Sequence, residues 1–259
     1  MKQNLTANLR QEWLAFLSGV RFFTRIRVSD RVPHSDALLA RAATYLPAIG
    51  LFVGMVSAVV FDLALTLLPQ TVSILLAMAA SLLVTGAFHE DGLSDTADGL
   101  GGGWDKDRIL AIMKDSRVGS YGVVAITTLL LLKFACLSET PAAWVPALLI
   151  SGHAFSRYCA VLVMSGMDYV RTDTSSRAKP LTEKLTGNAL IAASVFGLLP
   201  LMLLPFPAML LGLAGGLLAT IWIGRKLQKW LGGYTGDCLG ALQQLSEVAF
   251  YLGALATLL

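Results

Sequence analysis

Long apolar segments constrain the fold of this chain more than any other feature of its sequence. Runs of about 20 residues with few charges recur along the chain, and a helix needs about that many apolar residues to cross the hydrocarbon core of a bilayer. Hydrophobic residues make up 55% of the 259 residues and charged residues only 14%, which is far from the composition of a soluble globular domain. We therefore predict an all-α, polytopic transmembrane helical bundle.

The apolar runs predict seven spans and a short arm that precedes them. No internal repeat or low-complexity linker divides the chain, so residues 1–259 are expected to form a single integral-membrane domain. Residues 1–43 would be an N-terminal arm, in which an amphipathic helix at 12–24 lies on the membrane surface. The hinges "LPQTV", "SETPA" and "PFPA" are short, so the helices that they join would pack as antiparallel hairpins. The predicted spans are 44–68, 71–88, 121–138, 142–165, 187–205, 207–224 and 238–257.

Basic residues fall on one side of this seven-span arrangement. Of the 20 lysines and arginines, all except Lys133 lie in the N-terminal arm or in the segments 89–120, 157–186 and 225–237, which share one side. The positive-inside rule makes that side the cytoplasm, so the N-terminus would be cytoplasmic and the C-terminus would lie on the opposite, periplasmic side. Lys133 lies near an outer helix end, from which its side chain can snorkel. The net charge of +3 does not indicate nucleic acid as a partner.

An acidic, glycine-rich stretch, "FHEDGLSDTADGLGGGWDKDR" at 88–108, follows the second predicted span. Asp91, Asp95 and Asp98 have the spacing i, i+4, i+7, which puts all three on one face of a helix. A divalent cation relieves their mutual repulsion, and oxygen ligands favour Mg²⁺ or Mn²⁺ with phosphate oxygens completing the shell. We predict that these aspartates, with Glu90, bind Mg²⁺ and through it a diphosphate. The alternative is a solvated acidic loop between two helices.

A basic motif, "KDSRVGSYG" at 114–122, comes just before the third span. Arg117 can bind a phosphate group bidentately, which fits a diphosphate held by the neighbouring aspartates. Positive charge at a cytoplasmic helix end also serves as an ordinary membrane anchor, and this is the alternative. The intervening run "GLGGGWD" would let backbone amides approach an anion.

Two further groups of polar residues occur where a bilayer would surround a helix. His153 and Arg157 are four residues apart in the fourth span, and Gln244 and Glu247 lie along the last one. Ionisable residues inside a span are costly and usually functional. We predict that all four bind substrate, with Glu247 lining a cavity open to the inside. Helix packing is the alternative for His153, and a helix–helix hydrogen bond is the alternative for Gln244.

Asp237 begins the last span on the same side as the acidic stretch. A carboxylate without a bound metal can accept the proton of an attacking hydroxyl, so we predict that Asp237 orients that hydroxyl or completes a metal shell. Capping of the helix N-terminus is the alternative, because aspartate is a preferred N-cap residue. The cysteines show no paired spacing and are expected to be small apolar residues; they are Cys136, Cys159 and Cys238.

Three motifs together resemble those of a known family. "HEDGLSDTADG", "MKDSRVGSYG" and "GGYTGDCLGA" resemble, in the same order, motifs of the cobalamin synthase family, the adenosylcobinamide-GDP ribazoletransferases. Chain length and span number also match, so the resemblance extends over nearly the whole chain. The family's acidic set corresponds to Asp91, Asp95 and Asp98. The other matching positions are Thr24, Arg25, Asp115, Arg117, Gly119, Ser156, Arg157, Thr235, Gly236, Asp237 and Glu247.

The resemblance implies a reaction between two large substrates. A ribose hydroxyl of α-ribazole, or of its 5′-phosphate, would attack the cobinamide-linked phosphorus of adenosylcobinamide-GDP. GMP would leave, and the product would be adenosylcobalamin or its 5′-phosphate. The resemblance implies Mg²⁺ as the metal and a site that faces the cytoplasm. We predict that Asp98, Arg117 and Asp237 are catalytic. The predicted substrate-binding residues are Arg25, Asp115, Arg117, His153, Arg157, Gln244 and Glu247.

Two other functions share some of these features. The aspartate spacing also resembles that of CDP-alcohol phosphatidyltransferases, but their signature continues from "DG" to an Ala-Arg pair, where this chain has Gly102 and Gly103. A cation-coupled transporter would place carboxylates near the bilayer midplane, often in repeated halves, whereas the acids here cluster at one membrane face. A homo-oligomer and association with other enzymes of the cobalamin pathway both stay open.

Overall fold

The computed structural model of this protein describes residues 2–170, 185 and 187–259, and these residues form helices without a β-strand. The prediction of an all-α fold is therefore confirmed. The α-helices are α1 (Lys2–Phe23), α2 (Asp36–Ala42), α3 (Leu46–Leu65), α4 (Gln70–Thr85), α5 (Phe88–Gly102), α6 (Lys106–Ile112), α7 (Ser120–Glu139), α8 (Val145–Gly166), α9 (Gly187–Leu198), α10 (Phe206–Leu231) and α11 (Gly236–Leu255). Short 3₁₀ helices are η1 (Ala43–Tyr45), η2 (Ala142–Trp144) and η4 (Leu199–Leu203).

Several of these helices have the length and composition of membrane spans. Four pass that test within the described residues, and the number rises to five if the bent pair α4–α5 forms one span. The segment α9–η4 is apolar but shorter. The four are the segments Asp36–Leu65, Ser120–Glu139, Ala142–Gly166 and Phe206–Leu231. The structure thus has an all-helical bundle with four or five helices that could span a membrane, whereas the count of seven spans and the sidedness stay predictions.

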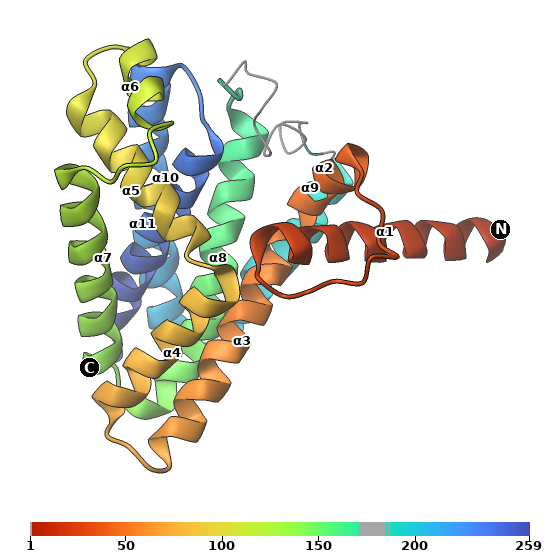
Figure 1. The fold of residues 1–259 in the computed structure, drawn as a ribbon. Helices are drawn as coiled ribbons and strands as arrows, with labels where there is room; N and C mark the ends of the chain where they lie inside the picture. The colour runs from red at the N-terminus through yellow and green to blue at the C-terminus, as the bar shows by residue number, and fades with distance from the viewer. Residues whose placement is uncertain (1, 171–184, 186) are drawn as a thin grey trace.

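The bundle is organised around two central helices, α8 and α11 (Figure 1). α3 packs along α8, and α10 packs along α11. Glycines allow the close approach of α3 and α8: a side chain at Gly50 would clash with the backbone carbonyl of His153, and one at Gly54 would lie 2.8 Å from Ile150 Cα. α1 lies at a steep angle to the other helices and projects away from the bundle (Figure 1), whereas its place on a membrane surface stays a prediction.

The acidic stretch is a helix, α5, and it begins at a sharp bend. The axes of α4 and α5 differ in direction by 86°. Two consecutive residues in the left-handed region, Gly86 (φ 67°) and Ala87 (φ 56°), produce the break. Arg25 reinforces it, because its backbone N–H donates to Val84 O at 2.7 Å and its side chain lies against Gly86. The predicted second span therefore ends at Thr85, and the aspartates lie on a separate helix.

Candidate functional site

The three aspartates among the four predicted metal ligands lie on one helix, α5, as their spacing predicted. Asp91 is exposed, Asp95 is half-buried and Asp98 is 8% exposed, so the row runs from solvent into the protein. The N–H of Gly119 donates to Asp98 Oδ2 at 2.7 Å, and the N–H of Gly122 donates to Oδ1 at 2.9 Å. Asp98 therefore satisfies backbone amides at the N-terminus of α7, where the helix dipole also favours a negative charge. Each carboxylate oxygen retains a second lone pair for another partner.

A polar cavity of about 330 Å³ lies where α5, α6 and α7 meet. It brings Asp98 together with the Asp115–Arg117 motif, although these residues come from separate parts of the chain. Arg108 on α6 and Tyr121 on α7 also line it, and both escaped the sequence analysis. An anion in this cavity would meet two arginines and the first residues of α7.

Asp115 and Arg117 hold each other in a fixed geometry beside this cavity. Arg117 Nη2 donates to Asp115 Oδ2 at 2.6 Å, and Arg117 Nε donates to Oδ1 at 3.0 Å. These hydrogen bonds lower the pKa of the Asp115 carboxyl to about 2 and raise the pKa of Arg117. The Arg117 side chain is 87% exposed, so its guanidinium is oriented by Asp115 and open to a ligand.

The start of α11 lies against the acidic helix. Gly92 packs on the backbone of Asp237: a side chain at Gly92 would lie 2.7 Å from Asp237 O. Thr235 is the N-cap of α11, and its hydroxyl accepts from Cys238 N at 3.3 Å. Asp237 lies in the first turn instead, so the interpretation of Asp237 as the N-cap is wrong.

A second charged cluster lies inside the bundle around Glu247, which is fully buried. Glu247 forms an ion pair with Lys133 of α7 and accepts from Tyr251 Oη at 3.0 Å and from Gln243 Nε2 at 2.6 Å. His153 Nδ1 of α8 is 3.3 Å from the same carboxylate. A buried charge needs partners of this kind because the interior solvates ions poorly.

This cluster corrects two expectations. Lys133 does not snorkel to the membrane surface; its side chain is 3% exposed and points to Glu247. Glu247 does not line an open cavity, because partners from α7, α8 and α11 enclose it. The signal for the pair was Lys133 itself, the single charge inside an otherwise apolar run.

The remaining predicted residues divide between this cluster and the bend. Gln244 Nε2 donates to Glu90 Oε1 at 2.7 Å, so Glu90 turns toward α11, about 100° around α5 from Asp91. Arg157 is 1% exposed, and its Nη1 donates to His153 O at 2.9 Å. Arg25 is exposed beside the bend. Substrate-binding roles for His153, Arg157, Gln244 and Glu247 therefore stay predictions for side chains that lie in the bundle interior.

The donor set on α5 fits a hard cation in its chemistry. No group of three or more His, Cys, Asp or Glu side chains is gathered into a metal cage in the described part of the chain. Mg²⁺, however, keeps several waters and commonly uses one or two carboxylates together with substrate phosphates. Asp91 and Asp95 share the open part of the α5 face, which suits that mode of binding.

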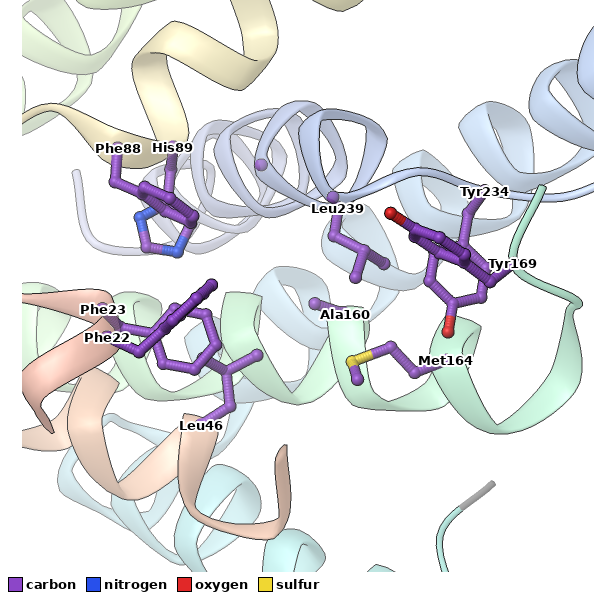
Figure 2. A pocket seen from close by; sticks show the side chains of 12 residues that line it. Phe22, Phe23, Leu46, Phe88, His89, Ala160, Met164, Tyr169, Tyr234 and Leu239 are labelled. Atoms are coloured by element: carbon purple, nitrogen blue, oxygen red, sulfur yellow. The ribbon is translucent and has the colours of Figure 1, made fainter. Parts of the chain in front are cut away.

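An aromatic pocket that no sequence pattern predicted lies at the start of the acidic helix (Figure 2). Phe88 and His89 at the start of α5 face Phe22 and Phe23 at the end of α1, and Tyr169 and Tyr234 lie at the other end. The one feature of the sequence that could have indicated this pocket is the aromatic pair Phe22 and Phe23 just before Thr24. The remaining lining residues are Leu46, Ala160, Met164, Gly236, Leu239 and Gly240.

Comparison with known proteins gives consistent results. A family model described as cobalamin-5-phosphate synthase matches residues 15–255. An adenosylcobinamide-GDP ribazoletransferase of Shewanella frigidimarina is 45% identical over 257 residues, covering 96% of this chain and 96% of that protein. The enzyme of the same name from Vibrio cholerae (El Tor Inaba N16961) is 40% identical over 256 residues, covering 98% of each chain. That from Polaromonas sp. is 39% identical over 272 residues, covering 94% of this chain and 96% of that protein. No solved structure matches the chain.

Proposed function

This chain belongs to the cobalamin-5-phosphate synthase family, and on that premise we propose that it is an adenosylcobinamide-GDP ribazoletransferase. A ribose hydroxyl of α-ribazole, or of its 5′-phosphate, attacks the phosphorus that carries cobinamide, and GMP leaves. The oxygen–phosphorus bond to ribose forms as the bond to the GMP oxygen breaks. The match over residues 15–255 carries this proposal, because it includes all three polar motifs.

The polar cavity between α5, α6 and α7 supplies the phosphate contacts in this proposal. Arg117 reaches the diphosphate with its Nη1 edge, while Asp115 holds the Nε and Nη2 donors. A guanidinium whose rotamer is fixed beforehand loses less entropy when it binds an anion. Arg108 lines the same cavity and adds positive charge there.

Mg²⁺ would be held by Asp91, Asp95 and Asp98. When bound, it would neutralise the charge of the diphosphate and that of the departing phosphate oxygen. Asp98 has a second task, because its hydrogen bonds to Gly119 and Gly122 fix the acidic helix to the α7 terminus beside Arg117. These hydrogen bonds hold the acidic helix and the Asp115–Arg117 motif in a fixed position relative to each other.

Asp237 serves the acceptor side of the reaction in this proposal. Thr235 is the N-cap of α11, so the cap does not require Asp237. In this proposal the Asp237 carboxylate orients the attacking hydroxyl and takes its proton, or completes the metal shell. Its backbone lies against Gly92, next to Asp91 in sequence. This close packing supports a site between α5 and α11.

The site faces the cytoplasm in the membrane arrangement that we propose. Successive long helices α3, α4, α7, α8, α9–η4, α10 and α11 alternate in direction (Figure 1), which supports seven crossings of a bacterial inner membrane. The end of α10 that carries Arg225, Lys226 and Lys229 lies beside α6, at the same end of the bundle as the polar cavity. A C-terminal alkaline phosphatase fusion should be active and a C-terminal fluorescent protein fusion dark; the reverse result would contradict this arrangement.

The test of function is a reconstitution. Purified protein in liposomes is incubated with adenosylcobinamide-GDP, α-ribazole and Mg²⁺, and the products are separated by chromatography. We expect GMP and adenosylcobalamin in equal amounts, and neither product when chelator replaces the metal. Release of CMP from CDP-diacylglycerol instead would favour a phosphatidyltransferase, and substrate counterflow without GMP release would favour a transporter.

A further inference from the structure

The aromatic pocket of Figure 2 has the chemistry of a site for a planar, weakly polar base. Four rings cluster at one end of it: Phe88 lies 5.7 Å from Phe22 and 6.0 Å from Phe23 between ring centroids, and the His89 ring is stacked on Phe23 at 16°. The pocket is lined almost entirely by apolar atoms. Flat faces of this kind bind aromatic bases by stacking.

His89 brings a polar ring to this otherwise apolar pocket. His89 is 4% exposed, and its Nδ1 is buried without a hydrogen bond to any described residue. Its ring points from α5 into the space above Phe22 and Phe23 (Figure 2). A buried nitrogen left unsatisfied is costly, so a ligand atom that pairs with it would be selected strongly.

The pocket lies next to residues of the proposed reaction site in the chain. Phe88 precedes Asp91 by three residues, so the two side chains lie on neighbouring parts of one helix face, about 4.5 Å apart along the axis. Gly236, which lines the pocket on α11, directly precedes Asp237. A base seated against Phe88 and His89 would therefore direct its attached sugar toward Asp91 and Asp237.

We propose that this pocket binds the benzimidazole base of the acceptor nucleoside, with His89 hydrogen-bonded to the ring nitrogen that carries no sugar. This inference rests on the proposed function, and it assigns the acceptor to a site separate from the phosphate cavity. The base is planar and apolar and offers one polar ring atom, which can accept a hydrogen bond from the His89 ring. Guanine fits this lining poorly, because its several donors and acceptors would be left unpaired among apolar atoms.

Binding must widen the pocket, because its free volume is about 30 Å³, room for only one or two waters. Two side chains that line the pocket can move to make room for the base. Phe88 is 40% exposed and can rotate outward, and Met164 has an unbranched, adaptable side chain. The base therefore enters by displacing side chains, and it reaches the acidic face only after Phe88 has moved.

The first test separates the two substrates kinetically. Phe88→Leu and His89→Leu should each raise KM for α-ribazole about tenfold or more, while KM for adenosylcobinamide-GDP changes less than about twofold. Phe206→Leu, at an exposed position at the start of α10 that lines neither pocket, should change neither KM. A rise in KM for the GDP-linked substrate alone, or an equal rise for both, would overturn the assignment.

The second test isolates the hydrogen bond of His89. The 5,6-dimethylindole analogue of α-ribazole lacks the accepting ring nitrogen but keeps its shape. Wild-type protein should prefer α-ribazole over this analogue about tenfold, and His89→Leu should abolish the preference. An unchanged preference in the variant would show that His89 does not contact the base.

A labelling experiment needs no turnover and so distinguishes failure of this inference from failure of the proposed function. The native cysteines are buried, so maleimide should modify Phe88→Cys protein at position 88. α-Ribazole alone, without metal or the GDP-linked substrate, should slow that modification, and GDP should not. No protection by α-ribazole, or protection by GDP alone, would overturn the pocket assignment even if wild-type protein releases GMP. If wild-type protein releases no GMP, the proposed function fails, whatever the labelling result.

Discussion

The Asp115–Arg117 pair and the Lys133–Glu247 pair use similar side chains in opposite surroundings. The first lies beside the polar cavity, where the Arg117 side chain is 87% exposed and that of Asp115 38%. The second lies in the bundle, where the side chains of Lys133 and Glu247 are 3% and 0% exposed. Water screens the first pair, so it contributes little to stability and is open to a ligand. The second pair is unscreened and joins two helices.

Charged side chains in this protein therefore have two separate uses. Around Glu247, contacts from α7, α8 and α11 converge on one carboxylate and fix the helices relative to each other. Around Arg117, the guanidinium has one partner from its own loop and faces a cavity. Substitutions in the two regions should therefore separate stability from activity.

The largest expected effect is on stability, in the buried cluster. Glu247→Ala should lower the free energy of unfolding by about 3–5 kcal/mol, because it leaves Lys133 charged and buried without its partner. Unfolding of the protein in nanodiscs, followed by circular dichroism, measures this loss. The double variant Lys133→Met, Glu247→Gln should recover much of it, since neither charge is then stranded. Unchanged stability of the single variant would contradict the structural role.

The aspartates on α5 should show the opposite behaviour. Asp91→Asn and Asp95→Asn should lower the rate of GMP release by at least ~100-fold without changing stability, because they would weaken a phosphoryl-transfer metal site. Asp98→Asn should lose activity equally and also about 1–3 kcal/mol of stability, because its amide group would face a backbone N–H. Near-normal turnover in all three folded variants would refute the metal hypothesis.

The start of α11 offers a matched comparison two residues apart. Asp237→Asn should lower turnover by about 100-fold, as expected when a group that accepts a proton is lost, and leave stability unchanged. Thr235→Ala should remove about 1 kcal/mol of stability, because Thr235 caps the helix. Steady-state kinetics and thermal unfolding of both variants decide the matter. Full activity of Asp237→Asn would exclude it from the chemistry.

Arg117 should affect substrate affinity more than folding. Arg117→Ala should raise KM for adenosylcobinamide-GDP about tenfold, because a bidentate contact with phosphate is lost, and should leave the unfolding temperature unchanged. Arg117→Lys should recover only part of the loss. Kinetics at two salt concentrations provide the control, since the wild-type advantage should shrink as salt rises. Unchanged KM in Arg117→Ala would remove this residue from the phosphate site.

The smallest expected effect concerns pH. Arg117 lowers the pKa of Asp115 from 3.8 to about 2, so any stability from this pair is complete above pH 3.8 and is lost as the pH falls toward 2. Between about pH 5 and 9 the carboxylate is fully ionised. Asp115→Asn should therefore leave the shape of the activity profile unchanged in that range. A shifted acid limb would mean that Asp115 titrates during turnover.

Much of the site could be predicted because its signals are local. The spacing of Asp91, Asp95 and Asp98 specifies a shared helix face, and α5 confirms the helix. The aromatic pocket could not be predicted, since Phe23, Phe88 and Tyr234 belong to three separated segments with no common spacing. The start of α5 lies beside the end of α1 because the chain bends at Gly86 and Ala87 (Figure 1).

The all-helical class, the acidic helix and the family could all be predicted from the sequence alone, because apolar length, helical period and contiguous motifs are properties of neighbouring residues. The hydrogen bonds and ion pairs between distant polar groups become visible only in the tertiary structure. Asp98 accepts hydrogen bonds from the amides of Gly119 and Gly122. Lys133 forms an ion pair with Glu247 on another helix. Such pairings follow from the need of every buried charge and amide for a partner, and packing rather than spacing selects which partner is within reach.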